Sequence, residues 1–365
     1  MATRLRSIWP AAVTLFITGG YLIIRLSGVG WDPSGVAEVG SRYLNLDPRG
    51  EQGYDGQFAY FMSLDPDPES VAPHLDAPAY RYQRILYPLS ARFLSFTNPE
   101  VIPWMLIAIN LGFHALATWG LAKYFENLEI WTGYALVYGL WVGLVAGVGL
   151  DLHEPLAYGL IVLGLLAWQS GRGKLGAVLI VTSLFAKETS IFFWLAALFG
   201  SYLYEDDRSS TRILIAGGAI FLVWQIWLYA TFGQVGIASG GDMATGFEWL
   251  PLMGFFKIGT ENLRALALYA VIFIPSIILP VVWGTFASIR EITRGWRKTE
   301  AWALLFNAML ILFLPFSTFR EPLGLVRVAT GFVLAMLVYS GSRKLHRPLN
   351  YSMFWIPMLV ILIPR

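Results

Sequence analysis

Long, unbroken apolar segments recur along the whole chain, and they constrain its fold more than any other feature. A helix needs about 20 mostly apolar residues to cross the hydrocarbon core of a bilayer. The segments lack the alternation of apolar and polar residues that marks the strands of a membrane barrel. Only 14% of the residues are charged and 56% are hydrophobic, which is more apolar surface than a soluble fold can cover. The sequence therefore predicts an all-α, polytopic membrane protein with one membrane domain, residues 1–365.

The composition also excludes several kinds of site and partner. The chain has no cysteine, which rules out disulfides, thiolate catalysis and cysteine-ligated metal centres. Its four histidines are scattered, and none is spaced as a metal-binding pair on a helix. The net charge of +2 indicates no nucleic-acid partner.

About eleven membrane spans are predicted. The apolar block 175–204 contains two of them, because one long helix would hold Lys187 and Glu188 in mid-bilayer at a cost of ~2.5 kcal/mol or more each. The first span is not a signal peptide, since its apolar run is too long and no small-residue cleavage site follows. The other spans cover about 7–28, 101–121, 130–150, 155–169, 213–232, 263–289, 301–318, 322–340 and 350–363.

Basic residues in the short loops predict which side of the membrane each loop faces. If the N-terminus is cytoplasmic, every short basic cluster lies on the cytoplasmic side, as the positive-inside rule requires. These clusters are Arg4 and Arg6, Lys123, Arg172 and Lys174, Arg208 and Arg212, Arg290 to Lys298, and Arg343 to Arg347. The outer side then has a long first loop with interfacial helices, about 30–100, and a second loop, about 233–262. We expect this multi-pass protein in the cytoplasmic (inner) membrane, in contact with its lipids.

The remaining unusual charges gather at the outer ends of the spans. Arg327 lies inside an apolar segment and needs a partner there, and it shares roughly one helical face with Arg320, seven residues earlier. A transporter would instead bury ionisable residues near the bilayer midplane. The pattern indicates a site at the outer surface, covered by the first loop. Its members are Asp55, Arg81, Arg84, Asp151, His153, Glu154, Lys187, Glu188, Arg320 and Glu321.

The segment GYDGQFAYFM, residues 53–62, offers a carboxylate to this site. The Asp55-Gly56 pair is typical of a tight turn. Such a turn would project Asp55 and Gln57 into a cleft, where Asp55 could accept a proton from an attacking hydroxyl or bind a divalent metal. A turn without a chemical role is the alternative.

The segment 75–96 offers cations. Arg81 and Arg84 are three residues apart and share a helical face, with Tyr80 and Tyr82 beside them. A pair of guanidinium groups suits bidentate binding of a phosphate. Anchoring among lipid headgroups is the alternative.

Two further motifs, DLHEP at 151–155 and AKETS at 186–190, allow two interpretations each. Asp151 and Glu154 fit a helix capping box, or His153 faces the cleft and binds a sugar hydroxyl. Lys187 and Glu188 form a self-neutralising turn, or Lys187 binds phosphate while Glu188 orients it.

Together, YDGQF, AYRYQRILYP, the EP pair of DLHEP and KET resemble the motifs of a bacterial group of GT-C-type integral membrane glycosyltransferases and their relatives. The resemblance covers most of residues 1–205. It implies a GT-C-like fold, a polyprenyl-phosphate-linked sugar donor and transfer at the outer leaflet to a glycan, lipid or protein acceptor. It also implies that Asp55 is the acidic residue of the first loop needed for catalysis.

One departure from the family concerns this loop. Many members have two acids there, whereas Asp55-Gly56-Gln57 supplies one. A divalent cation, Mg²⁺ or Mn²⁺, held by Asp55 therefore stays an open alternative. With a single base, direct displacement at the anomeric carbon would invert its configuration. Two other functions remain open, a flippase or transporter of lipid-linked sugars and a non-catalytic scaffold; convergence of Asp55 with the arginines in one outer cleft would favour the enzyme.

Overall fold

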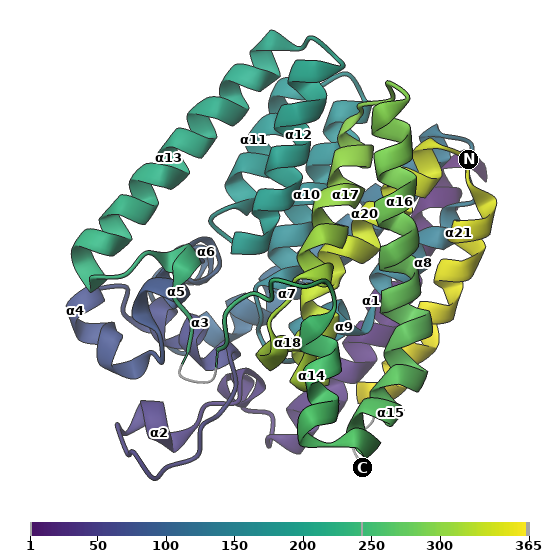
Figure 1. The fold of residues 1–365 in the computed structure, drawn as a ribbon. Coiled ribbons are helices and arrows are strands. Elements are labelled where there is room, and N and C mark those ends of the chain that lie inside the picture. Colours follow the sequence, from purple (N-terminus) through teal and green to yellow (C-terminus); the bar gives the residue numbers. More distant parts are fainter. Residues whose placement is uncertain (1, 242–243, 363–365) are drawn as a thin grey trace.

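The computed structural model describes residues 2–241 and 244–362, and every regular element in these ranges is helical. Figure 1 shows long helices bundled side by side, with short helices of the first loop gathered at the lower end. The predicted all-helical fold is thereby confirmed for these ranges.

Five helices are long and apolar enough to cross a membrane. A sixth candidate is a bent pair, Thr132–Gly139 with Val142–Gly149, whose halves meet at 52°. The predicted count of eleven is not confirmed, because the helices at four further positions have only 10–17 residues. The five candidate spans are Arg6–Gly28, Ile102–Asn127, Arg208–Phe232, Leu263–Thr293 and Pro322–Ser342.

The bundle consists of helices from along the entire chain. Its elements are α1 (Ala2–Gly28), α7 (Ile102–Asn127), α8 (Ala135–Gly139), α9 (Val142–Gly149), α10 (Glu154–Gln169), α11 (Gly173–Ser183), α12 (Ile191–Leu203), α13 (Arg208–Phe232), α15 (Leu263–Phe273), α16 (Leu279–Thr293), α17 (Thr299–Leu312), α19 (Pro322–Val328), α20 (Thr330–Ser342) and α21 (His346–Ser352). A 3₁₀ segment, Met353–Leu362, follows α21, so the predicted span 350–363 is not one straight α-helix; its residue 363 lies outside the described ranges.

Short helices fill the two predicted outer loops. The first loop contains α2 (Ser41–Leu44), α3 (Gly56–Leu64), α4 (Pro68–Val71), α5 (Pro78–Tyr82) and α6 (Leu86–Leu94). The second contains α14 (Met253–Glu261), and α18 (Phe316–Arg320) packs against it. Short 3₁₀ turns lie at Pro33–Ala37, Ala72–His74, Thr132–Tyr134, Glu188–Ser190 and Gly236–Ala238.

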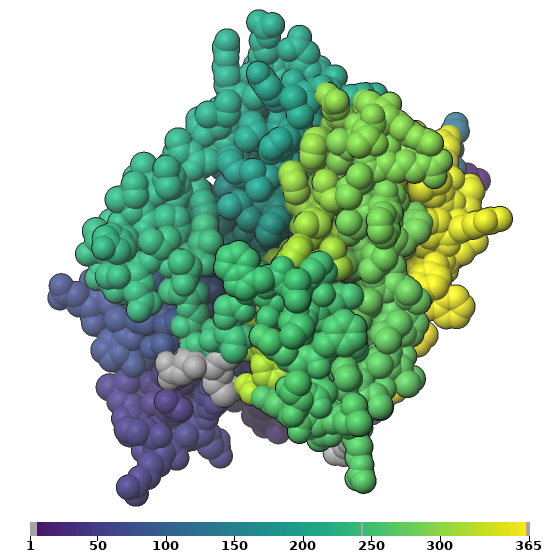
Figure 2. All heavy atoms as spheres, in the orientation of Figure 1, coloured from purple at the N-terminus to yellow at the C-terminus, as the bar shows by residue number. Residues whose placement is uncertain are grey.

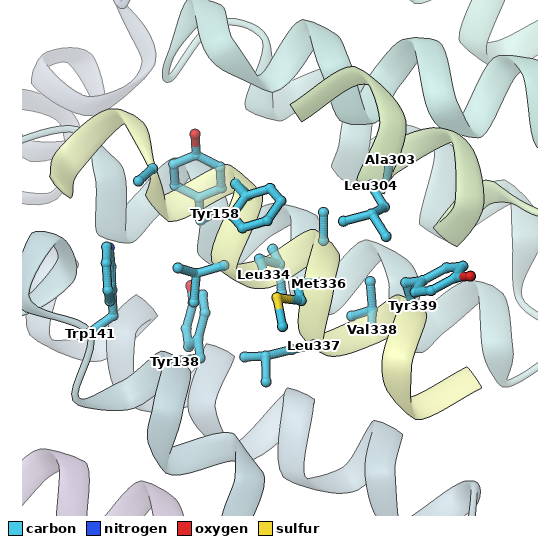
Figure 3. Close-up of a cluster of buried hydrophobic side chains, with 14 of the residues drawn as sticks. Tyr138, Trp141, Tyr158, Ala303, Leu304, Leu334, Met336, Leu337, Val338 and Tyr339 are labelled. Carbon is cyan, nitrogen blue, oxygen red and sulfur yellow. The ribbon is translucent and has the colours of Figure 1, made fainter. Parts of the chain in front are cut away.

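The core of the bundle surrounds α20, which is buried on all sides, as expected for a helix that is apolar all round. Figure 3 shows Leu334 and Leu337 of this helix in one apolar cluster with Tyr138, Tyr158 and Leu304 from three other helices. These contacts fix the position of the segment just before α20, which carries Arg327.

The apolar block 175–204 forms two helices, α11 and α12, as predicted. Lys187 and Glu188 lie in the break between these two helices. Neither charge is therefore in the middle of one long apolar helix. Helix α12 packs against both α13 and α17, and Figure 2 shows the surface hollowed between those two helices.

Candidate functional site

A cavity of about 490 Å³ lies where five parts of the chain meet at one end of the bundle. These parts are the first loop, the start of α10, the break before α12, Ala244 of the second loop, and the segment α18–α19. Four acidic and four basic side chains line it: Asp55, Glu154, Glu188 and Glu321, with Arg84, Lys187, Arg320 and Arg327. The predicted convergence of charges from distant motifs is therefore observed.

Asp55 is held by two guanidinium groups. Arg81 Nη2 donates to Asp55 Oδ1 at 2.9 Å, and Arg327 Nη1 donates to Oδ2 at 2.8 Å. The carboxylate remains 29% exposed, toward the cavity it lines. Burial acts to raise the pKa of Asp55, but Arg81 and Arg327 outweigh it and hold the pKa well below its ordinary value. Asp55 is therefore ionised and faces the cavity.

Arg81 supports Asp55 from behind and does not line the cavity. Its Nε and Nη2 atoms donate to Asp76, both at 2.7 Å. The guanidinium also lies over the Phe58 ring, 4.2 Å from its centroid. Asp76 therefore fixes Arg81, and Arg81 fixes Asp55.

Arg84 forms a two-pronged pair with Glu188. Its Nε and Nη2 atoms donate to the two carboxylate oxygens at 2.6 and 2.8 Å. Tyr80 adds its hydroxyl as an acceptor and its ring as a platform 4.2 Å away. Burial lowers and Glu188 raises the pKa of Arg84, and the net direction is upward, so the guanidinium is permanently charged.

Glu154 pairs with the two remaining buried cations of the site, Lys187 and Arg327. Lys187 Nζ and Arg327 Nε both donate to Glu154 Oε1, at 3.0 and 2.9 Å. The side chain of Glu154 is fully buried, and its Oε2 atom has no partner among the described residues. Because Arg327 also binds Asp55, the segment before α20 links α10 to the first loop.

Arg320 is the most accessible of the basic residues that line the cavity. It is exposed at the end of α18, and its guanidinium lies 5.5 Å from the centroid of the Phe316 ring. No ion pair involves it within the part of the chain that the structure describes. It can therefore approach an anion without first leaving a carboxylate.

Gln57 and Tyr82, both predicted to contact substrate, do not line the cavity. Gln57 accepts from the Gly40 amide at 3.1 Å and donates to the Gln52 carbonyl at 2.8 Å, so it ties the first loop together. Tyr82 is buried and donates to the Pro66 carbonyl at 2.6 Å. Both residues stabilise the loop that covers the site.

The expected Asp-Gly turn takes a different form. Asp55 has helical dihedral angles, φ −56° and ψ −28°, and Gly56 begins α3. The left-handed glycine is Gly53, with φ 68°. Gly56 is required for another reason: a Cβ atom there would lie 2.0 Å from the Leu150 carbonyl oxygen. This close approach sets α3, and hence Asp55, against the start of α10.

Asp151 and His153 lie behind the cavity and do not line it. The capping box is not formed, since His153 is the N-cap of α10 and no side chain caps that end. Tyr87 donates to Asp151 Oδ1 at a long 3.5 Å, while Asp151 Oδ2 and His153 Nε2 have no partner among the described atoms. Burial raises the pKa of Asp151 and lowers that of His153, so both groups favour their neutral forms.

The sequence reasoning missed two members of the network, Tyr54 and Asp76. Tyr54 accepts from Arg327 Nη1 at 3.0 Å and donates to Glu321 at 2.9 Å. Asp76 holds Arg81, as described above. Their only signals in the sequence were adjacency to Asp55 and a spacing of five residues from Arg81.

The immediate partners of Asp55 are guanidinium groups rather than further oxygen ligands. Mg²⁺ needs oxygen ligands in near-octahedral array, but both Asp55 oxygens accept from arginines. In the described ranges, no three acidic or histidine side chains are grouped as metal ligands.

The arrangement suits an anion beside a base: an accessible carboxylate lies among cations that could also contact a phosphate. Other proteins supply no further guide, because comparisons with protein-family models, curated proteins and solved structures find no match.

Proposed function

We propose that this chain is a GT-C-type membrane glycosyltransferase with about eleven spans and a cytoplasmic N-terminus. It moves a sugar from a polyprenyl-phosphate donor to a glycan, lipid or protein acceptor at the outer face of the cytoplasmic membrane. One observation carries the proposal: Asp55, Arg84, Lys187, Arg320 and Arg327, from three separate parts of the chain, line one cavity.

Binding of the donor phosphate begins at Arg320 and ends among the buried cations. Arg84, Lys187 and Arg327 are already paired with carboxylates, so the phosphate shares these cations with acidic partners. This sharing keeps the ground state from being bound too tightly. As the bond to the sugar breaks, charge grows on the phosphate oxygen, and the same preset cations stabilise the transition state.

Asp55 acts as the general base. A phosphate that draws on Arg327 weakens the hold of that residue on Asp55, so the pKa of the carboxylate rises when donor binds. The acceptor hydroxyl attacks the anomeric carbon and its proton passes to Asp55. The bond between that carbon and the phosphate oxygen breaks, and polyprenyl phosphate leaves with the electron pair. A single displacement inverts the anomeric configuration, and no step requires a metal.

Two alternatives are less well supported. A flippase or transporter needs ionisable groups along a path through the membrane, whereas the buried pairs of Arg84, Lys187 and Arg327 all gather at one end. A non-catalytic scaffold would not need an accessible carboxylate among cations.

The test is a donor screen with purified, reconstituted protein. Several polyprenyl-phosphate sugars are supplied, with the matching nucleotide sugars as donors that lack the lipid. The leaving group of each donor is measured, polyprenyl phosphate for the former and the nucleoside phosphate or diphosphate for the latter. We expect release from at least one lipid-linked donor and from no nucleotide sugar. Donor binding without release from any member of the panel would instead indicate a scaffold or transporter.

A further inference from the structure

A second cavity, of about 600 Å³, lies between α16, α20 and α21. Arg327 of the first site is near the start of the span Pro322–Ser342, and Lys344 of the second cavity follows its end. At 1.5 Å of rise per helical residue, these two positions are separated by about 25 Å along the bundle. The second cavity is therefore a separate site at the opposite end.

The walls of this cavity are apolar. Leu279, Pro280 and Trp283 of α16 form one side, and Met336 of α20 contributes to the lining. Helices α16 and α20 both belong to candidate spans, so the walls lie in the apolar layer. An alkyl chain would find continuous apolar contact along them.

A π-helical turn, Ile274–Ile278, directly precedes the cavity wall, which begins at Leu279. In this turn the Leu279 amide bonds to the Ile274 carbonyl, five residues back. The Pro275 carbonyl would bond in the same way to residue 280, but Pro280 has no amide hydrogen. Tyr351 of α21 donates its hydroxyl to that carbonyl instead, at 2.5 Å. This hydrogen bond ties α21, through the cavity-lining Tyr351, to the π turn that precedes α16.

The other end of the cavity is basic. Lys344, His346 and Arg347 line it, and all three are exposed. Lys344 has one ion pair, with Glu129 at 3.3 Å, in which both side chains are more than half exposed. Such an exposed pair holds its members weakly. Lysine and arginine clusters at the end of a span attract anionic lipid headgroups.

We infer that this cavity binds an anionic phospholipid of the bilayer. Its phosphate lies against Lys344 and Arg347, and an acyl chain lies along α16 between Trp283 and Leu279. The charge of the rim selects the headgroup, and the apolar walls require a lipid rather than a soluble phosphate. The bound lipid would stabilise the packing of α21 on α16.

The test is native mass spectrometry of the full-length purified protein titrated with phosphatidylglycerol or with phosphatidylcholine of the same acyl chains. The variant is Lys344→Asn with Arg347→Gln; asparagine suits position 344, where φ is 52°. The control is Arg42→Gln with Arg49→Gln, an equal loss of charge in the first loop, away from the ends of the candidate spans. Thermal unfolding in detergent verifies that each variant folds.

We expect phosphatidylglycerol to bind more tightly than phosphatidylcholine. The Lys344/Arg347 variant should lose roughly 30-fold in affinity for it, while the control pair stays close to wild type. Equal affinity for the two lipids, or equal losses in both variants, would overturn the inference. Equally tight binding of glycerol phosphate, which has no acyl chain, would also overturn it.

Discussion

Asp55 accepts from Arg81 and Arg327, and these two cations keep its carboxylate ionised beside the cavity. The two partners differ in how far the sequence predicts them. Arg81 is close in the chain, and its motif was recognisable. Arg327 is 272 residues from Asp55, and an apolar segment with one arginine shows only that a partner is needed, not which one. Tyr54 and Asp76 were missed because a tyrosine or aspartate in a loop has no distinguishing pattern.

The acid limb of the pH profile tests the charge state of Asp55. Because its pKa is depressed in the free protein, kcat/KM should stay level from pH 7 to 5 and fall only below about 4, under the ordinary carboxyl value. The acid limb of kcat should lie at higher pH, because bound phosphate draws Arg327 away. The ionised carboxylate also stabilises the fold above the ordinary pKa, and this contribution is lost as the pH falls through the folded-state value. If the acid limb of kcat/KM has its midpoint between pH 5 and 7, a group other than Asp55 is the base.

Neutralising Arg320 should weaken donor binding without unfolding the protein. Arg320 is exposed and lines the cavity, so Arg320→Gln should reduce donor affinity about 5- to 10-fold, measured by titration of the reconstituted protein. Arg84→Lys keeps the charge but loses the two-pronged geometry, so it should lower donor affinity about 10-fold. Arg49→Gln, at an exposed position of the first loop, is the matched control. If both cavity variants bind donor with wild-type affinity, the donor phosphate does not bind in this cavity.

Among the elements, α3 shows where a local sequence rule failed. The Asp55-Gly56 pair predicts a turn, but the tertiary contact with Leu150 selects the start of a helix. Other elements followed their patterns. The pair Lys187 and Glu188 correctly predicted a helix break within 175–204. One continuous helix would have placed both charges in the apolar layer, which is costly in any fold. The bend within 130–150 could not be predicted, because it is held by a distant contact: Trp141 Nε1 donates to the Val326 carbonyl at 2.9 Å.

Adding one methyl group at Gly56 should disturb this junction. The new Cβ of Gly56→Ala would lie 2.0 Å from a backbone oxygen, so α3 must shift, at a cost of roughly 1–3 kcal/mol. Gly112→Ala is the control, because nothing lies within 4 Å of its Cβ position on α7 and alanine favours a helix by about 0.5–1 kcal/mol. Thermal unfolding in detergent should give a lower midpoint for the first variant and an equal or higher one for the second. Equal midpoints would show that the approach of α3 to Leu150 is not tight.

At the scale of the whole molecule, the sequence predicted the helical membrane class and the gathering of charges at one end. It predicted the number of spans less well, because helices such as α11 and α17 are too short to meet the length criterion alone. Their apolar residues pack against neighbouring helices. Hydropathy alone does not distinguish a helix buried in this way from one that spans the membrane.

Cysteine accessibility tests the sidedness of the bundle. The chain has no cysteine, so single substitutions report without background. Cysteine at the exposed position Asp47 should react with an impermeant thiol reagent from outside intact cells, and cysteine at the exposed position Arg172 only after the membrane is opened. Lys187 is a poor reporter because it is buried. The reverse labelling pattern would place the candidate site on the cytoplasmic side.

Turnover of Asp55→Asn against wild type tests the proposed catalytic role most directly. The variant keeps the shape of the side chain but cannot take up the proton, and Asp47→Asn makes the same change at an exposed loop position. With a lipid-linked donor found in the screen, Asp55→Asn should fold, bind donor at least as tightly because Arg327 loses a competing carboxylate, and transfer sugar roughly 10²-fold or more slowly. Asp47→Asn should match wild type. Sugar transfer by Asp55→Asn at the wild-type rate would exclude Asp55 as the general base.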